Sequence, residues 1–395
     1  MMNIIQKGII IILKSAITGE KYNLPDNFNL EEAATYIARH NIEPLIYIGA
    51  LNCGITKENP FMQVLFGKYC NMLLYSERQT AEIERIYNAF DENNIDYMPV
   101  KGCNMKALYP HPEMRVMGDA DILIKIEQYE KVEQIMTELG FNFISKGDHD
   151  YAWRSENLHV ELHYLLMYAY NEVYGNYFGN GWNRAYGHEG NKYYMSDEDD
   201  FIYQFIHFTK HYRIGGIGCR HVVDLWVYLR THIRMNFNYI EETISRLSVK
   251  EFYNNTMNLI EVWFNNGEQD AIIEYMTQFI FESGSWGTLE HSALAAGVKE
   301  IQDNDVTPSK GKNNIIKSIV FPSASALSSK YKILKSAPLL LPVIWIIRWV
   351  DVFLFRSDNI KLQRKKIKSL SSDSITEYEK NLKLVGLDFK FNEKE

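Results

Sequence analysis

Two aspartates separated by one residue are the positions whose type and spacing most directly suggest chemistry. Asp119 and Asp121 lie in the segment 117–124, where apolar Ile122 and Ile124 alternate with the acids. This alternation predicts a strand that carries both carboxylates on the same face. The same Asp-x-Asp spacing also occurs by accident on half-solvated strands, so the pair alone does not establish catalysis.

A third carboxylate, Glu161, stands in a second alternating segment, Leu158–Tyr164. Val160 and Leu162 are expected to face a core, and Glu161 and His163 the opposite side. If the two strands are neighbours, three carboxylates meet and need a cation to neutralise them. All-oxygen ligation suits a hard ion, Mg²⁺ with Mn²⁺ as the alternative. Two such ions would stabilise the attacking and leaving oxygens of a phosphoryl or nucleotidyl displacement.

A strand-to-helix turn precedes the aspartates. The apolar run Tyr97–Val100 leads into Lys101 and Gly102, and a helix-compatible segment follows to Tyr109. A glycine at such a turn lets the backbone approach a phosphate, and the free N–H groups of a helix N-terminus attract anions. Lys101 would add a positive charge there.

The order of these segments resembles the DNA polymerase β-like nucleotidyltransferase superfamily. More closely, it resembles a large, mostly uncharacterised bacterial nucleotidyltransferase family with an LKG, R-x-x-x-D-x-D and E-L-H pattern. The matching segments are Val100-Lys101-Gly102, Leu108-Tyr109-Pro110, Met114-Arg115, Met117-Gly118-Asp119-Ala120-Asp121 and Val160-Glu161-Leu162-His163. Looser similarity continues through Asp197-Glu198-Asp199-Asp200-Phe201, His207, His211, Gly215-Gly216, Arg220-His221-Val222-Val223-Asp224-Leu225 and Phe321-Pro322-Ser323.

The resemblance implies a metal-dependent enzyme that moves a nucleoside monophosphate from an NTP, such as ATP, to an acceptor and releases pyrophosphate. It implies that Asp119, Asp121 and Glu161 are catalytic and bind the metal, with Glu161 also activating the acceptor hydroxyl. The implied nucleotide- and phosphate-binding residues are Lys101, Gly102, Asn104, Arg115 and Gly118. The implied substrate-binding residues are His163, His207, His211 and Arg220.

One feature departs from the wider superfamily, in which a Gly-Ser or Gly-Gly pair stands closer to the paired acids. Here the turn reads Lys101-Gly102-Cys103 and lacks the small hydroxyl that often contacts the nucleotide phosphates. Contacts to phosphate would then fall to backbone amides, Lys101 or Asn104.

We expect an α+β fold, with a small mixed-sheet core flanked by N-terminal and C-terminal helical regions. With 395 residues, the chain is too long for one ordinary domain. The expected divisions are a helical region at 1–94, the α/β core with an irregular aromatic loop at 95–195, a helical domain at 196–302, and a polar linker with a helical tail at 303–395. Within the core, the segment Asp148-His149-Asp150 is expected to form a hairpin turn rather than a metal site.

Composition excludes some classes of function. A formal net charge of -8 argues against a general nucleic-acid binder. The four cysteines are widely spaced without a Cys-x-x-Cys pair, which argues against a zinc knuckle or a disulfide framework and favours the reducing cytoplasm.

The longest apolar run near the C-terminus, Ala337–Ile347, is shorter than the roughly 18 to 20 residues that a membrane span needs, so no transmembrane segment is expected. It is interpreted as a buried or docking helix. The alternative is a membrane-surface contact through residues 337–368, aided by the basic run 361–368.

The sequence leaves the acceptor open between a small molecule, a sugar, a protein and RNA. Two other functions fit the same scaffold. One is a non-catalytic nucleotide-binding, regulatory or polysaccharide-locus accessory protein, which the altered Lys101-Gly102 turn favours. The other is a toxin-like nucleotidyltransferase that acts on tRNA or protein.

Overall fold

A computed structural model describes residues 2–167, 172–328, 330–355 and 370–388. The chain forms two compact units. The first contains residues 1–208 and 218–285, and the second contains residues 209–217 and 286–395. The candidate site lies in the first unit, so that unit is described in more detail.

The N-terminal region of the first unit is helical, as expected. Its helices are α1 (Ile4–Thr18), α2 (Ala34–His40), α3 (Glu43–Asn52) and α4 (Pro60–Glu92). Helix α4 begins because the Asn59 side chain accepts hydrogen bonds from the Phe61 and Met62 amides and Pro60 occupies the first turn. It leads directly into the first strand.

A seven-stranded mixed sheet follows, with strand order β3-β4-β5-β2-β1-β7-β6. The strands are β1 (Tyr97–Val100), β2 (Ala120–Ile124), β3 (Asn142–Lys146), β4 (Asp150–Arg154), β5 (His159–His163), β6 (Ala185–Glu189) and β7 (Lys192–Met195). The β2–β5 and β1–β7 pairs are parallel, and the other pairs are antiparallel. Within the described residues, three α-helices lie between strands along the chain: α5 (Gly102–Lys106), α6 (Tyr129–Glu138) and α7 (Glu172–Phe178). This mixed sheet among helices confirms the α+β fold.

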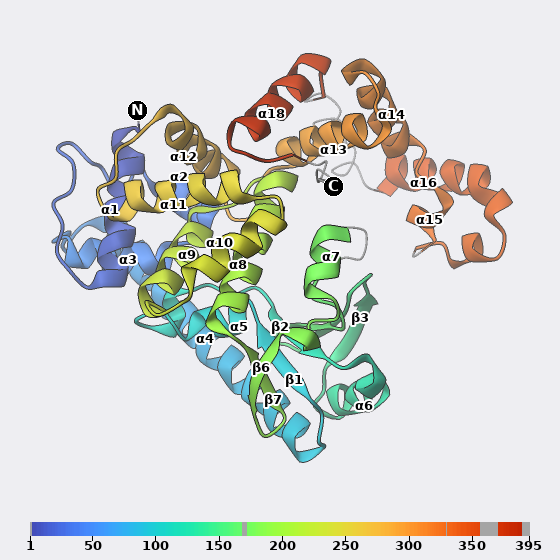
Figure 1. Cartoon of the computed structure of the whole chain (residues 1–395), viewed down its shortest axis with the longest axis horizontal. Helices are drawn as coiled ribbons and strands as arrows, with labels where there is room; N and C mark the ends of the chain where they lie inside the picture. Colours follow the sequence, from blue (N-terminus) through green and yellow to red (C-terminus); the bar gives the residue numbers. More distant parts are fainter. Residues whose placement is uncertain (1, 168–171, 329, 356–369, 389–395) are drawn as a thin grey trace. The chain divides into compact units, whose positions relative to one another are not determined.

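One face of the sheet is covered by α4 and α6 (Figure 1). Ile86 and Phe90 of α4 pack there against alternate residues of the strands, including Ile122 of β2 and Val160 of β5. Because side chains alternate across a strand, the residues between these apolar ones face the opposite side. The polar residues of β2 and β5 therefore share the face that α4 and α6 leave uncovered.

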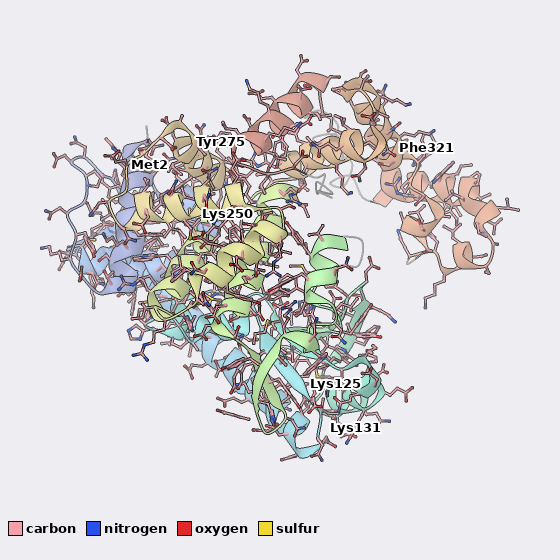
Figure 2. The ribbon with its side chains drawn as sticks, viewed as in Figure 1. Met2, Lys125, Lys131, Lys250, Tyr275 and Phe321 are labelled. Atoms are coloured by element: carbon pink, nitrogen blue, oxygen red, sulfur yellow. The ribbon has the colours of Figure 1, made fainter. Side chains whose placement is uncertain are left out.

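Two lysines tie the start of α6 to the turn between α4 and β1. Lys125 Nζ lies 2.6 Å from Asp96 Oδ2, and Lys131 Nζ donates to the Asn93 carbonyl at 2.5 Å. Both lysines are labelled in Figure 2. These contacts fasten the start of α6 to the turn that joins α4 to β1.

The aromatic segment after β5 is not an irregular loop, so that expectation is wrong. Residues 168–171 lie outside the described part of the chain, but the rest forms α7 (Glu172–Phe178) and the β6–β7 hairpin. Gly181 shows why the sequence pattern did not predict this structure. Its φ is 84°, and a Cβ atom there would lie 2.6 Å from Leu166 Cγ, so only glycine fits at this position. Leu166 is distant in sequence, and a local pattern does not reveal this packing.

Five further helices begin in the first unit: α8 (Asp197–Ile214), α9 (Cys219–Thr231), α10 (Phe237–Arg246), α11 (Lys250–Phe264) and α12 (Ala271–Ser283). Ser196 caps α8, since its Oγ accepts from the Asp199 amide at 3.1 Å. The end of α8 belongs to the second unit.

The second unit is helical where the structure describes it: α13 (Leu289–Asn304), α14 (Pro308–Val320), α15 (Ala324–Leu327), α16 (Leu341–Phe355) and α18 (Ser372–Leu384). Single 3-10 turns occur across the chain at Pro112–Met114, Ile126–Gln128, Trp182–Arg184, Lys332–Lys335 and Pro338–Leu340. The polar linker expected at the start of the region 303–395 is wrong, because only a short turn with a left-handed Asp305 separates α13 from α14, which begins at Pro308.

Most of the apolar run near the C-terminus is exposed, although Ile344 is buried. This contradicts the interpretation as a buried helix, and the docking helix stays a prediction. Leu339 is 95% exposed, and Val343, Ile346 and Val350 are also exposed. Within the described residues, no helix combines the length and apolar character needed to cross a bilayer. The basic run 361–368 lies outside the described residues.

Candidate active site

Strand pairing brings the predicted carboxylates together. β5 lies parallel to β2, and Asp121 is the register partner of Glu161. The condition for the three carboxylates to meet, that these strands are neighbours, is therefore fulfilled. β2 begins at Ala120, one residue after Asp119, and carboxylate oxygens of Asp119 and Glu161 lie within 4.8 Å of each other. Asp119, just before β2, and two acids on the adjacent strands thus converge at the sheet face opposite α4 and α6.

Lys101 and His163 both contact Asp121. Lys101 Nζ lies 2.5 Å from Asp121 Oδ1, and His163 Nε2 lies 2.7 Å from the same oxygen. His163 is completely buried, and the Asp121 side chain is 6% exposed. Asp121 is therefore held between a cation and an imidazole at the base of the site.

The backbone at Lys101 is strained. Its φ is 49° and its ψ is -116°, in a region that non-glycine residues rarely adopt. The turn from β1 into α5 forces this conformation, and Gly102 follows with little room for a side chain, because a Cβ atom would lie 3.1 Å from Met117 Sδ and from Arg115 Nη1. The strain places the Lys101 ammonium group beside Asp121.

The ion pair dominates the electrostatics of Asp121. Burial would raise the pKa of Asp121, but Lys101 and the hydrogen bond with His163 outweigh burial and hold it well below its usual range. Burial likewise opposes the charge on Lys101, but Asp121 raises the Lys101 pKa above its ordinary value. Burial and the Lys101 charge lower the pKa of His163, which favours a neutral ring.

The other two acids are less well compensated: Glu161 Oε2 lies 3.6 Å from His163 Nε2, and the pKa values of both acids are raised. Burial, followed by the charges of Asp121 and Asp119, raises the pKa of Glu161 to about 7. Burial and Asp121 also raise the pKa of Asp119. A bound cation would stabilise the ionised forms of Asp119 and Glu161, which the neighbouring negative charges now disfavour. The two acids are therefore suited to bind a metal ion.

Two sets of donor atoms at this face are close enough to share a metal ion. One consists of Asp119, His159 and Glu161, and the other of Asp121, Glu161 and His163. Within each set, one donor atom per residue lies within 4.8 Å of the others. Both sets are rich in carboxylates, so the residues fit a divalent cation. His159 is an additional candidate that sequence reasoning missed, although its alternation with Glu161 and His163 along β5 was visible in the sequence.

Arg115 has a carboxylate partner within the protein. Its Nε and Nη2 atoms lie 2.8 and 3.1 Å from the two oxygens of Asp224, and the Tyr109 hydroxyl donates to Asp224 at 2.7 Å. Arg115 and Asp224 are both buried. This bidentate pair connects the loop before the aspartates to α9, and the predicted phosphate contact of Arg115 stays a prediction.

The other predicted phosphate-binding residues surround the same turn. Asn104 lies in α5, and its side-chain amide donates to the Pro99 carbonyl at 3.0 Å. Gly118 is exposed immediately before Asp119. Gly102 starts α5. Their positions near Lys101 keep a phosphate role open as a prediction.

The predicted substrate-binding residues have different locations. His163 lies inside the site, and Arg220 of α9 donates through Nη1 to the Val116 carbonyl, in the loop that carries Asp119. Its charge also acts to lower the Asp119 pKa. His207 and His211 are half-buried on α8, in the first and second unit respectively. Their substrate-binding role stays a prediction.

Comparisons with known proteins agree with the resemblance seen in the sequence. A model of the family described as uncharacterised nucleotidyltransferase matches residues 26–265, which is more than half of the chain. No curated protein matches the chain. One solved structure, the solution structure of the antibiotic-resistance factor ANT(2'')-Ia, matches with a TM-score of 0.33 and 13% sequence identity. The match covers 43% of this chain and 91% of the ANT(2'')-Ia chain. That similarity is too low to bear on the assignment, which rests on the family match. The chain therefore belongs to the uncharacterised nucleotidyltransferase family and is a transferase.

Proposed function

We propose that this protein transfers a nucleoside monophosphate from an NTP to an acceptor hydroxyl and releases pyrophosphate, with Mg²⁺ or Mn²⁺ bound by Asp119, Asp121 and Glu161. The observation that supports this best is the convergence of the three carboxylates, two of which have a raised pKa without a cation. Divalent ions bound there would neutralise the charge that develops on the attacking and leaving oxygens.

The protein's own residues then have distinct tasks. Lys101 orients Asp121 and supplies positive charge near the triphosphate. The backbone amides of the turn at Lys101 and Gly102 would provide donors for phosphate oxygens. Glu161 is the candidate base, since a pKa of about 7 is close to that of an efficient proton acceptor at neutral pH. Arg220 lies on the Asp119 side, where it would contact substrate.

The acceptor remains open between a small molecule, a sugar, a protein and RNA. The four cysteines are free, which supports a reducing compartment such as the cytoplasm. The exposed apolar residues of 339–350 support a peripheral contact with a membrane surface.

One observation favours a second candidate function, nucleotide binding without transfer. Lys101 already neutralises Asp121 at 2.5 Å, so the protein supplies one cation of its own to the site. If Lys101 remains in that position, a nucleotide could bind while a metal ion at Asp121 is excluded.

The test is to incubate the purified full chain with labelled ATP, CTP, GTP or UTP, Mg²⁺ or Mn²⁺, and a cell extract, and to measure pyrophosphate release and labelled products. Asp119→Asn and Asp121→Asn are expected to reduce turnover by at least about a hundredfold, because each removes a metal ligand. Asp148→Asn, which changes an exposed carboxylate nearby, is the control and should retain activity. Full activity in either site variant would exclude the metal assignment. NTP binding without pyrophosphate release would favour the second candidate.

A further inference from the structure

A cluster of two histidines and one aspartate lies next to the carboxylates but is not explained by nucleotidyl transfer. It consists of His149, Asp150 and His163, each with a donor atom within 4.8 Å of the others. Asp150 is the register partner of His163 in the β4–β5 pair. His149 ends the predicted hairpin turn, and its ring centroid lies 5.1 Å from that of His163.

The backbone holds this cluster in place. The His149 carbonyl accepts from the Tyr164 amide at 2.9 Å, which fastens the hairpin turn to the end of β5. Asp150 Oδ2 lies 3.4 Å from His149 Nδ1. On the other side, a Cβ atom at Gly147 would lie 2.4 Å from Asp150 Oδ1, so the absence of a side chain at Gly147 leaves room for this carboxylate. His149 is buried and the Asp150 side chain is 15% exposed, so the donors are shielded from most water.

The two ring nitrogens of His163 have different environments. Nε2 contacts Asp121, whereas Nδ1 is buried and has no hydrogen-bond partner among the described residues. A buried nitrogen left without a partner costs on the order of 1 to 3 kcal/mol. Since the ring is completely buried, water does not offset this cost. The orphaned Nδ1 points to a ligand that is not part of the polypeptide.

The donor types identify the chemical class of that ligand. Two imidazoles and one carboxylate suit a borderline transition-metal ion such as Zn²⁺, whereas Mg²⁺ and Ca²⁺ prefer oxygen ligands. In many zinc sites, a ligating histidine donates its second N–H to a carboxylate. Asp121 stands in that position relative to His163, with its Oδ1 2.7 Å from Nε2.

We propose that His149, Asp150 and His163 bind a Zn²⁺-like transition-metal ion, with His163 coordinating through Nδ1. A neutral imidazole has one N–H, so coordination at Nδ1 leaves that proton on Nε2, where it is donated to Asp121. The ion would thereby fix the His163 ring and the orientation of Asp121. This second site shares His163 with the donor set Asp121, Glu161 and His163, but it does not depend on nucleotidyl transfer taking place.

The test uses Co²⁺ as a spectroscopic probe on the full chain after metal has been removed with a chelator. With excess Mg²⁺ present to occupy the carboxylate site, we expect visible absorption bands that saturate at one Co²⁺ per chain and are displaced by Zn²⁺. His149→Ala and Asp150→Asn should each weaken binding by at least about tenfold, as the loss of a group that supports a metal site does. Circular dichroism and thermal unfolding in chelator establish whether each variant is folded, and His149→Gln replaces His149→Ala if the alanine variant is not.

Two controls separate this site from its surroundings. Asp148→Asn changes the exposed acid next to His149 and should leave the Co²⁺ spectrum and affinity unchanged. Asp119→Asn changes a carboxylate outside the cluster and should also leave them unchanged, although the proposed transfer activity is lost.

Unchanged Co²⁺ affinity in folded His149 and Asp150 variants would overturn the inference. Loss of the Co²⁺ bands in Asp119→Asn alone would also overturn it, because the ion would then occupy the carboxylate site. If Co²⁺ binding follows the expected pattern but no NTP is turned over, the metal site stands and the proposed function fails.

Discussion

Glu161 lies between two other carboxylates on a partly buried sheet face, and this position makes the site sensitive to pH. Burial and the charges of Asp121 and Asp119 raise its pKa from 4.5 to about 7. Folding therefore favours the protonated form of Glu161. The contribution of this protonated side chain to the free energy of unfolding is fully present below pH 4.5 and is lost as the pH rises through about 7.

Replacing Glu161 with glutamine tests whether ionisation of Glu161 lowers the free energy of unfolding as the pH rises. Glu161→Gln keeps a neutral side chain, so without divalent cations it is expected to be more stable than the natural protein at pH 8, by on the order of 2 kcal/mol. The difference should disappear below about pH 4.5. Urea unfolding across this pH range measures it, with Glu156→Gln, which changes an exposed acid, as control. A difference that does not vary with pH would contradict the raised pKa.

A divalent cation should offset the loss of stability that ionised Glu161 causes at high pH. At pH 8, saturating Mg²⁺ or Mn²⁺ is expected to raise the unfolding temperature of the natural protein, because an ion that binds only the folded chain at about 100 times its dissociation constant adds about 2.7 kcal/mol. The increase should be much smaller in Asp119→Asn and unchanged in Asp148→Asn. Equal shifts in all three proteins would mean that the ion binds elsewhere.

The short loop before β2 is positioned by α9, an element more than 90 residues later in the chain. Arg115 in that loop is clamped by Asp224 of α9, and Tyr109 donates to the same carboxylate. Burial would raise the pKa of Asp224, but Arg115 and Arg220 keep it below its usual range. The clamp therefore fixes the loop that leads into Asp119.

Breaking this clamp is expected to destabilise the first unit. Asp224→Asn leaves the Arg115 guanidinium buried without a compensating charge, which costs about 3 kcal/mol or more. The measurement is the free energy of unfolding in urea. Asp197→Asn, at a position whose side chain is 60% exposed, is the matched control and should change it by less than about 0.5 kcal/mol. A small effect at Asp224 would mean that Arg115 finds water or another partner.

The whole chain combines a mixed α/β core and helices in the first unit with a helical second unit whose apolar residues are unusually exposed. Leu339 and Ile346 are exposed by 95% and 60%. Exposed apolar side chains gathered in one short stretch are typical of an interaction surface, whereas isolated ones are not. The exposed apolar stretch lies in the second unit and the carboxylate site in the first, so the two features can be tested independently.

Membrane-surface binding through this stretch can be measured by sedimentation with vesicles that contain anionic lipid. The natural chain is expected to sediment with the vesicles. Leu339→Glu combined with Ile346→Glu should reduce the bound fraction at least about fivefold, because both changes remove apolar area and add negative charge. Leu74→Glu, which alters an exposed leucine of α4, should not. Failure of the natural chain to bind would exclude the membrane contact.

The sequence by itself determined the local faces of the site. Alternation along β2 and β5 predicted that Asp121, Glu161 and His163 turn away from the core, and Lys101-Gly102 predicted the turn into α5. Both predictions depend on short-range periodicity and turn chemistry, which a few neighbouring residues specify.

Only the tertiary structure decided which strands are neighbours and in what register. The parallel pairing of β5 with β2 sets Glu161 beside Asp121, and the β4–β5 register sets Asp150 opposite His163. Neither follows from alternation, because a period of two indicates a face but not a partner. The Arg115–Asp224 contact and the pairing of the β6–β7 hairpin with β1 were missed for the same reason: the residues that pair are distant in sequence, and long-range packing selects them.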